Sequence, residues 1–426
     1  MIYQDFFSLA QAKGIENIQI TEETQKENSI YLIDKKLQDY TDSEKITYLV
    51  KAEIDGKTEQ LFTEYLDESI IDIIIEKLNT TDSNYNDEYL ALTTNNEIND
   101  VPNIDITQET DRMIHLNDLA KNYSKIKNLE LAYSDMYRKT RIINNRGVDI
   151  ATSAHNYELY VGASAQEDEK ISSYSEAVLV SDKTKLDFPK TINDVLNLAT
   201  LAINKKKLET KKYDIVLNEE VASQIIREMQ AMLSAENIHQ KKSCLESKLN
   251  EKVFSDKLTI IEEPLNKVYP GYTIFDKEGT KTKNKLLIEN GIIKQYIYDI
   301  KESKLDNISS TGNKYNGIGT RNMYVIPGDK SLEEIFKKVN NGIYITHYMG
   351  SMGSIVNASS GNVSMQVFGY IIENGKLVCG FEPAVLTTTI FELLSNIEEI
   401  GNMLKFSSLS AASPALYIKD ISIAGK

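Results

Sequence analysis

Histidine and cysteine are the residues of this sequence best suited to bind zinc, and there are few of them. The histidines stand apart from one another, at His115, His155, His239 and His347. A zinc hydrolase needs several neutral imidazoles or thiolates that converge on one point. Only the segment HQKKSC brings two such side chains together, His239 and Cys244. We interpret them as a surface histidine after a helix and a buried thiol.

Other familiar catalytic patterns are also missing. The stretch GSMGS contains serine, but it lacks the spacing of the G-x-S-x-G nucleophile turn. No G-x-x-x-x-G-K-[ST] loop exists to hold phosphate groups. The glycine-rich stretch GNKYNGIGTRN, residues 312–322, does not join an obvious strand to a helix, and we expect a loop there.

Composition and charge exclude several classes of protein. The 426 residues carry a formal net charge of −15, and no basic face for a nucleic-acid backbone is visible. The two cysteines are far apart in sequence, which fits a reducing cytosol, so we expect a cytoplasmic protein. We find no apolar run long enough to cross a membrane, and we expect that the first residues are not a signal peptide.

The predicted helices and strands divide the chain into an N-terminal α/β region of two small units and a larger C-terminal domain. In the first unit we expect helices over 4–13 and 67–79, two strands within 17–37, and a hairpin at Asp55–Gly56. Residues 85–111 are acidic and rich in asparagine, which predicts a linker or surface loop. The predicted units are 1–84, 112–208 and 213–426.

The C-terminal domain is predicted to be mixed and mostly antiparallel, so the overall class is α+β. Asn218 can cap a helix whose apolar face includes Val221, Ile225, Met229 and Met232. Two Asn-Gly pairs predict two-residue hairpin turns, at residues 290–291 and 374–375. We also expect a helix with a capping box at 331–334 and a last helix over 387–402.

The C-terminal half resembles the TldD/PmbA family, also called peptidase family U62 or modulators of DNA gyrase. The resemblance rests on an ordered series of segments rather than on one motif. They are VLNEEVASQIIREM, LTIIEEPL, YTIFDKEGTKTKNKLLIENGIIKQYIYD, GTRNMYVIPGDKSLEEI, GIYITHYMGSMGSIVNASSGNVSMQVFGYIIENG and SPALYIKDISIAGK. The stretch RGVDIATSAHNYELYVGASAQED resembles the middle segment of the family.

Within the family, the chain resembles the PmbA/TldE branch more than the TldD branch. In the TldD branch of the family that this chain resembles, the expected metal ligands are the histidines of an H-E-x-x-x-H motif and a cysteine near the C-terminus. Arg227 and Met232 occupy the two histidine places here, Glu228 keeps the glutamate place, and the late segment FSSLSAASP has no cysteine. Arginine, methionine and serine do not replace these ligands, so we expect no cofactor in this chain and zinc in a TldD-type partner.

The segment Met349–Gln366, MGSMGSIVNASSGNVSMQ, is crowded with glycine and serine. Small residues let an extended chain approach the backbone, and strand addition needs little side-chain specificity. The resemblance places this segment beside a peptide-processing cleft, so it predicts a cleft wall or subunit contact. The alternative is an ordinary turn-rich connection. The contact residues we expect are Gly350, Ser351, Gly353, Ser354, Asn357 and Gly361.

The resemblance implies a non-catalytic subunit of a cytosolic metallopeptidase that acts on unfolded or small modified peptides. The expected partner is a metal-bearing TldD-type chain, in a heterodimer, or a second copy of this chain; neither nucleic acid nor membrane is expected as a partner. A stand-alone peptide-binding or scaffold protein is the alternative from another class. A third possibility is an enzyme that acts through a site not visible in the sequence.

Overall fold

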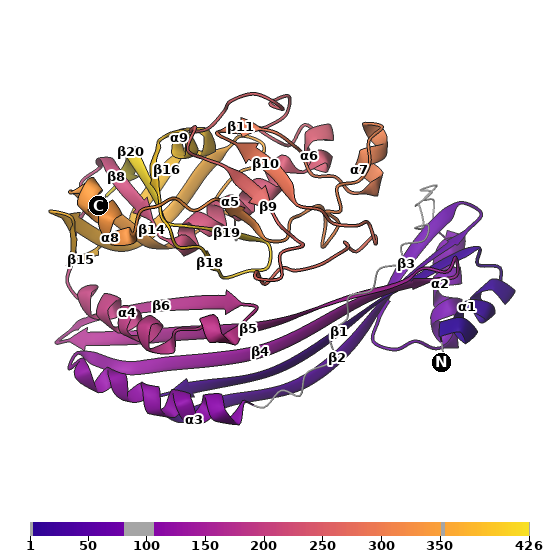
Figure 1. The fold of residues 1–426 in the computed structure, drawn as a ribbon, viewed down its shortest axis with the longest axis horizontal. Helices are drawn as coiled ribbons and strands as arrows, with labels where there is room; N and C mark the ends of the chain where they lie inside the picture. The colour runs from indigo at the N-terminus through magenta and orange to yellow at the C-terminus, as the bar shows by residue number, and fades with distance from the viewer. Residues whose placement is uncertain (1–2, 81–105, 351–353, 426) are drawn as a thin grey trace.

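The computed structural model describes residues 3–80, 106–350 and 354–425, and it confirms the α+β class. A long, curved antiparallel sheet carries the N-terminal and middle regions, and the C-terminal domain lies along one side of it (Figure 1). Most strand pairs are antiparallel, and the parallel pairs involve short edges or the C-terminal sheet.

The two predicted N-terminal units share this sheet. The two strands expected within 17–37 are one strand, β1, which pairs with β4 from Gln19–Asn144 to Ile33–Glu130. Strand β1 continues through its polar central residues because β2 and β4 both form backbone hydrogen bonds with it along its length. The six main strands are β1 (Asn17–Ile33), β2 (Lys36–Ile54), β3 (Lys57–Thr63), β4 (Ile126–Asn144), β5 (Asp149–Glu167) and β6 (Lys170–Val180).

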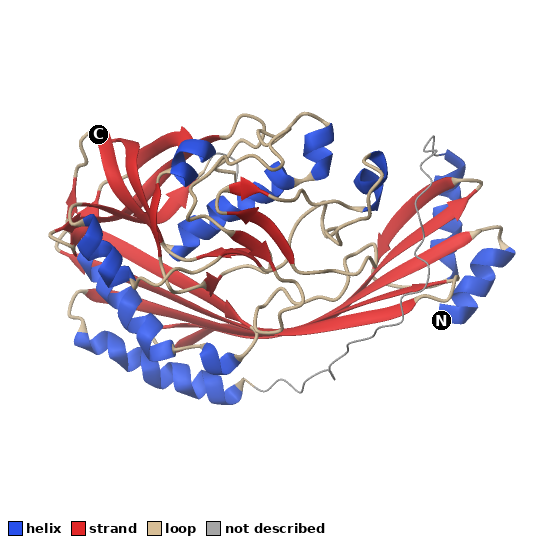
Figure 2. Cartoon of the chain, turned by 45° about the horizontal axis from the view of Figure 1, so that its top comes forward, coloured by secondary structure: helices blue, strands red, loops and turns tan. Residues whose placement is uncertain are grey.

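Helices cover both ends of the long sheet (Figure 2). At one end, α1 (Tyr3–Ala12) and α2 (Glu68–Thr80) bury an aromatic and isoleucine cluster against β1 and β2. At the other end, α4 (Phe188–Leu201) covers β4, β5 and β6, and α3 (Thr107–Leu116) packs against β1. Helix α3 begins inside the predicted 85–111 linker, whose residues before 106 lie outside the described part of the chain.

The C-terminal domain places helix α5 (Glu219–Leu233) in the largest apolar core, between two sets of strands. One set extends the long sheet through a single contact of β18 with β6. It contains β9 (Ile260–Glu262), β10 (Lys285–Glu289), β11 (Ile292–Ile293), β12 (Met323–Val325), β18 (Lys405–Phe406) and β19 (Ala411–Ser413). The other set is a separate sheet of β7 (Lys205–Lys206), β8 (Lys211–Leu217), β13 (Gly342–Met349), β14 (Asn362–Glu373), β15 (Lys376–Phe381), β16 (Ala384–Thr389), β17 (Ile397–Ile400) and β20 (Leu416–Ala424).

The turns and caps of this domain follow the sequence closely. Both Asn-Gly pairs have positive φ at each residue, at 47° and 77° for 290–291 and at 51° and 73° for 374–375, and each joins two antiparallel strands. Ser331 and Glu334 form the expected capping box of α8 (Leu332–Val339). The remaining short helices are α6 (Ala235–His239), α7 (Ile300–Leu305) and α9 (Ile390–Ser395).

The prediction of one helix over 387–402 was wrong. Only α9 is helical there, with strand β16 before it and β17 after it. Thr387, Thr388 and Thr389 are β-branched and pair with β14, and the Thr389 side chain then caps α9 by accepting from the Glu392 amide at 3.1 Å. Across the described residues, no helix is long and apolar enough to span a membrane.

Candidate functional site on helix α5

Helix α5 is fixed by its cap and by its buried face. The Asn218 side chain accepts from the Val221 amide at 2.9 Å and donates to the Thr346 carbonyl at 3.1 Å, so one residue both starts the helix and ties it to β13. Val221, Ile225 and Met229 are fully buried. The opposite stripe of the helix is therefore left free to carry polar groups.

That stripe holds a hydrogen-bonded series of side chains. Arg227 donates to the Gln224 side-chain oxygen, and the Gln224 amide donates to Glu228 at 2.6 Å. The second carboxylate oxygen of Glu228 accepts from the Ser354 hydroxyl at 3.0 Å. These groups border a shallow groove of about 310 Å³ that Ile318 closes from a neighbouring loop. The groove is polar and open to solvent, which suits contact with another chain.

The glycine- and serine-rich segment is the connection between β13 and its antiparallel neighbour β14. Gly350 and Ser354 are exposed at its start. Asn357 is also exposed, but its side-chain oxygen accepts from the Ser359 and Ser360 amides and so closes a turn. The candidates Ser351 and Gly353 lie outside the described residues.

Gly361 differs from the other candidates of this segment because it faces the protein interior. Its φ is +73°, and a Cβ atom there would lie 3.2 Å from Ile390 and 3.3 Å from the Cys244 sulfur. The residue is buried, so the structure does not place it on an open wall. Its role in the structure is to let the chain turn closely past α9.

The residues at the expected ligand positions do not fit a metal ion. Arg227 is an exposed cation, whereas Met232 is fully buried with its sulfur 3.5 Å from that of Cys244. Glu228 is bound by Gln224 and Ser354. Among residues 3–80, 106–350 and 354–425, no three His, Cys, Asp or Glu side chains are grouped as a metal site would require.

The four histidines lie in separate environments. His115 lies near the Asp111 carbonyl, His155 contacts Asp135, and His239 lies between Glu302 and Asp306. His347 makes an edge contact with the Tyr174 ring, and burial lowers its pKa. His239 and Cys244, close in sequence, make different contacts and do not form a pair.

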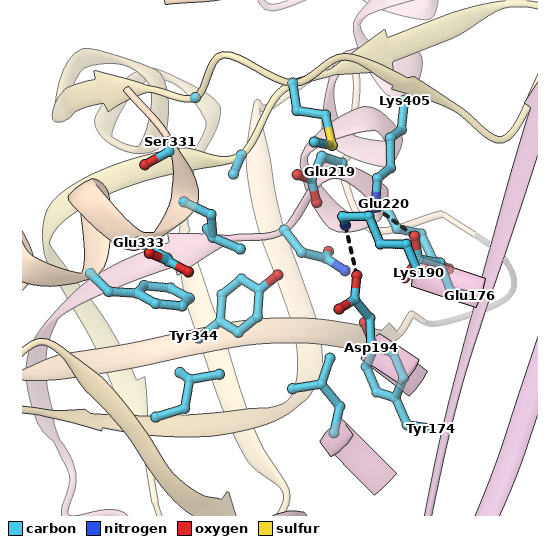
Figure 3. A pocket seen from close by; sticks show the side chains of 18 of the residues that line it. Tyr174, Glu176, Lys190, Asp194, Glu219, Glu220, Ser331, Glu333, Tyr344 and Lys405 are labelled. Atoms are coloured by element: carbon cyan, nitrogen blue, oxygen red, sulfur yellow. Dashed lines mark hydrogen bonds and ion pairs between the residues drawn. The ribbon is translucent and has the colours of Figure 1, made fainter. Parts of the chain in front are cut away.

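A cavity of about 420 Å³ lies beside the N-terminus of α5, between the long sheet and the C-terminal domain (Figure 3). Two ion pairs border it, Lys405–Glu176 at 2.5 Å and Lys190–Asp194 at 2.8 Å. Tyr344 is 4% exposed and directs its hydroxyl into the space, where no described residue forms a hydrogen bond with it. The cavity was not predicted from the sequence, because its lining comes from many parts of the chain, between Tyr174 and Ala415.

The cavity carries more acidic than basic groups. Besides the two ion pairs, Glu219, Glu220 and Glu333 line it. Burial raises the pKa of Glu219 and of Glu220, because removal from water disfavours the charged carboxylate. An amine or another hydrogen-bonding cation would relieve this penalty, so the lining suits a basic group rather than an anion.

Comparison with known proteins gives this geometry a family context. Residues 210–425 match the model of the PmbA/TldA metallopeptidase C-terminal domain, and residues 99–203 match that of the PmbA/TldA metallopeptidase central domain. The chain belongs to the PmbA/TldD family.

Individual relatives and solved structures are similar to this chain. A metalloprotease of Methanocaldococcus jannaschii is 28% identical over 70% of this chain and 67% of its own length. A PmbA metalloprotease homolog of Buchnera aphidicola is 27% identical over 57% of this chain and about half of its own length, 53%. The crystal structure of a modulator of a DNA gyrase from Thermotoga maritima superposes with a TM-score of 0.89, at 25% identity and 99% coverage of both chains. TldE from Thermococcus kodakarensis, 17% identical, shares the fold with a TM-score of 0.84 over 99% of this chain and 100% of its own.

Proposed function

We propose that this PmbA/TldD-family chain is a PmbA/TldE-type subunit that holds no metal ion of its own. It assembles in the cytoplasm with a TldD-type chain that carries zinc, and the pair hydrolyses unfolded or small modified peptides. In that assembly the partner supplies the metal-activated water, and this chain supplies part of the peptide cleft.

One observation carries the proposal: the polar side chains along α5 satisfy one another without a metal ion. Gln224 and Ser354 satisfy both oxygens of Glu228, and Arg227 adds a positive charge where a cation would have to bind. Like charges repel, so the guanidinium disfavours a divalent ion at this place. The groove beside it remains open for a peptide or for the partner subunit.

The test is purification from the native cell without tags that bind metal, followed by mass spectrometry and metal analysis. We expect a TldD-type chain to co-purify, with one zinc per pair and none in this chain after separation. Peptidase activity should require both chains and should be lost with a chelator. One tightly bound zinc in the separated chain, with chelator-sensitive cleavage, would contradict the proposal.

The alternative, a stand-alone peptide-binding protein, gives a different result in the same experiment. The chain would then purify without a peptidase partner and would still bind extended peptides. The acidic cavity beside α5 favours peptides with a basic side chain in either case, because its acidic groups outnumber its lysines.

A further inference from the structure

Two of the six arginines of this lysine-rich, acidic chain line the same pocket. Arg138 lies on β4 of the long sheet, and Arg321 lies in the loop that precedes β12. The pocket has a volume of about 160 Å³ and lies between the face of the sheet and the loops of the C-terminal domain. It is separate from both the α5 groove and the acidic cavity.

Within the described part of the chain, no carboxylate forms an ion pair with either guanidinium, although the negative charge of Glu23 acts on both. Burial, followed by repulsion from Arg321, lowers the pKa of Arg138 to about 10, so both groups are charged at neutral pH. The Arg321 guanidinium lies 4.4 Å from the centre of the Tyr315 ring, which holds it without neutralising it. Two like charges in a partly buried space are unfavourable unless an anion joins them.

The other polar groups of the pocket support an anion rather than an internal ion pair. Glu23 lines the pocket, but it pairs with Lys277 at 2.8 Å. Asp276 is 1% exposed and accepts from the backbone amides of Glu278, Thr280 and Lys314. The two arginines therefore leave the pocket with an excess of positive charge.

A second, independent observation comes from the strand next to β4. Thr152 of β5 is opposite Thr140 of β4, and both line the pocket. Thr152 is 5% exposed, and its hydroxyl oxygen is buried without a hydrogen-bond partner. A buried hydroxyl in this state is destabilising unless a ligand or water completes it, so the pocket offers one more donor beside the two guanidiniums.

We propose that Arg138, Arg321 and Thr152 form a binding site for a small oxyanion, a phosphate or a carboxylate group. Both ligands present the delocalised oxygens that guanidinium groups bind through paired hydrogen bonds. The volume admits such a group but not a whole nucleotide.

The site also has a structural connection to α5. Arg321 donates its backbone amide to Glu262 at 2.9 Å, and the neighbouring Thr320 amide donates to the Gln230 side chain of α5 at 2.9 Å. Ile318 of the same loop borders the α5 groove. An anion between β4 and this loop would hold the loop against the long sheet and so fix one border of the groove.

The experiment measures thermal unfolding and calorimetric binding of the purified full-length chain. Inorganic phosphate and acetate are compared with chloride at constant ionic strength. We expect phosphate or acetate to raise the melting temperature in a concentration-dependent way that chloride does not reproduce. Stabilisation by phosphate alone identifies a phosphate site, and stabilisation by acetate a carboxylate site. The same response to all three salts would overturn the proposal.

The matched variants are Arg138→Gln, Arg321→Gln and, as control, Arg141→Gln. Arg141 is also on β4, but it points to the opposite face and pairs with Asp149. We expect binding at least about tenfold weaker in the first two variants and unchanged in the control. Without anion, the first two should be no less stable than the parent at low salt, because a repulsion is removed. Arg138→Lys keeps the charge but loses the paired geometry, and it should bind with intermediate affinity. Equal anion affinity in Arg138→Gln and the parent would refute the site.

Discussion

The hydroxyl of Ser354 donates to the carboxylate of Glu228 at 3.0 Å, across 126 positions of sequence. This contact joins the connection between β13 and β14 to the polar face of α5. Both residues were singled out from the sequence, one in a small-residue segment and the other in a degenerate ligand motif. Their contact makes the glutamate an anchor for the segment rather than a free base.

The first prediction concerns this anchor. Glu228→Ala should free the Ser354 end of the segment, because both hydrogen bonds to the carboxylate are lost. Glu228→Gln should keep the segment in place, since its amide oxygen can still accept one bond. We expect faster hydrogen exchange over 354–356 in the alanine variant only, with a loss of stability of roughly 1 kcal/mol at this partly exposed site. Equal exchange in both variants would show that Glu228 does not position the segment.

The second prediction concerns Met232, which occupies a position where a TldD-type chain is expected to carry a histidine ligand. Met232→His should lower stability by roughly 2–4 kcal/mol, because a polar ring would replace an apolar side chain in a fully buried place. Combined with Arg227→His, it should still bind no stoichiometric zinc. Met232→Leu is the control, and it should lower stability by less than about 1.5 kcal/mol. Denaturant unfolding and metal analysis measure both effects, and a restored zinc site in the double variant would contradict our account of α5.

Local features were predictable from the sequence where neighbouring residues decide them. The Asn218 cap, the apolar face of α5 and the two Asn-Gly turns depend on residues within a few positions. The Ser354–Glu228 contact and the acidic cavity depend on distant segments that meet only in the folded chain. The continuous strand β1 was missed because its polar centre interrupts the hydrophobic pattern, although β2 and β4 pair with it throughout.

The third prediction separates two reasons for a glycine at residue 361, its positive φ and the lack of space for a Cβ atom. Gly361→Ala should be destabilising by roughly 1–2 kcal/mol from positive φ alone, and by more if Ile390 and Cys244 cannot move away. Gly14→Ala is the matched control, because Gly14 also has positive φ, +92°, but nothing lies within 4 Å of the added Cβ. The difference between the two variants in melting temperature reports the packing around Gly361. An unchanged melting temperature in Gly361→Ala would show that residue 361 is not closely packed against Ile390 and Cys244.

The last prediction uses pH to test His239, which joins α6 to α7. Burial opposes its protonation, but hydrogen bonds with Glu302 and Asp306 outweigh burial and raise its pKa above the ordinary value of 6.5. The protonated ring therefore stabilises the folded chain, and this contribution is complete below pH 6.5, the ordinary pKa of histidine. The contribution disappears as the pH rises through the pKa of His239 in the folded chain. His239→Gln should therefore be less stable than the parent chain below pH 6.5, by roughly 0.5–1 kcal/mol after solvent screening, and the difference should shrink toward pH 8. His115→Gln, at an exposed position of α3, is the control for the same substitution outside this contact. Denaturant unfolding from pH 5.5 to pH 8 measures the difference in stability between His239→Gln and the parent. A difference that grows with rising pH would contradict a raised pKa of His239.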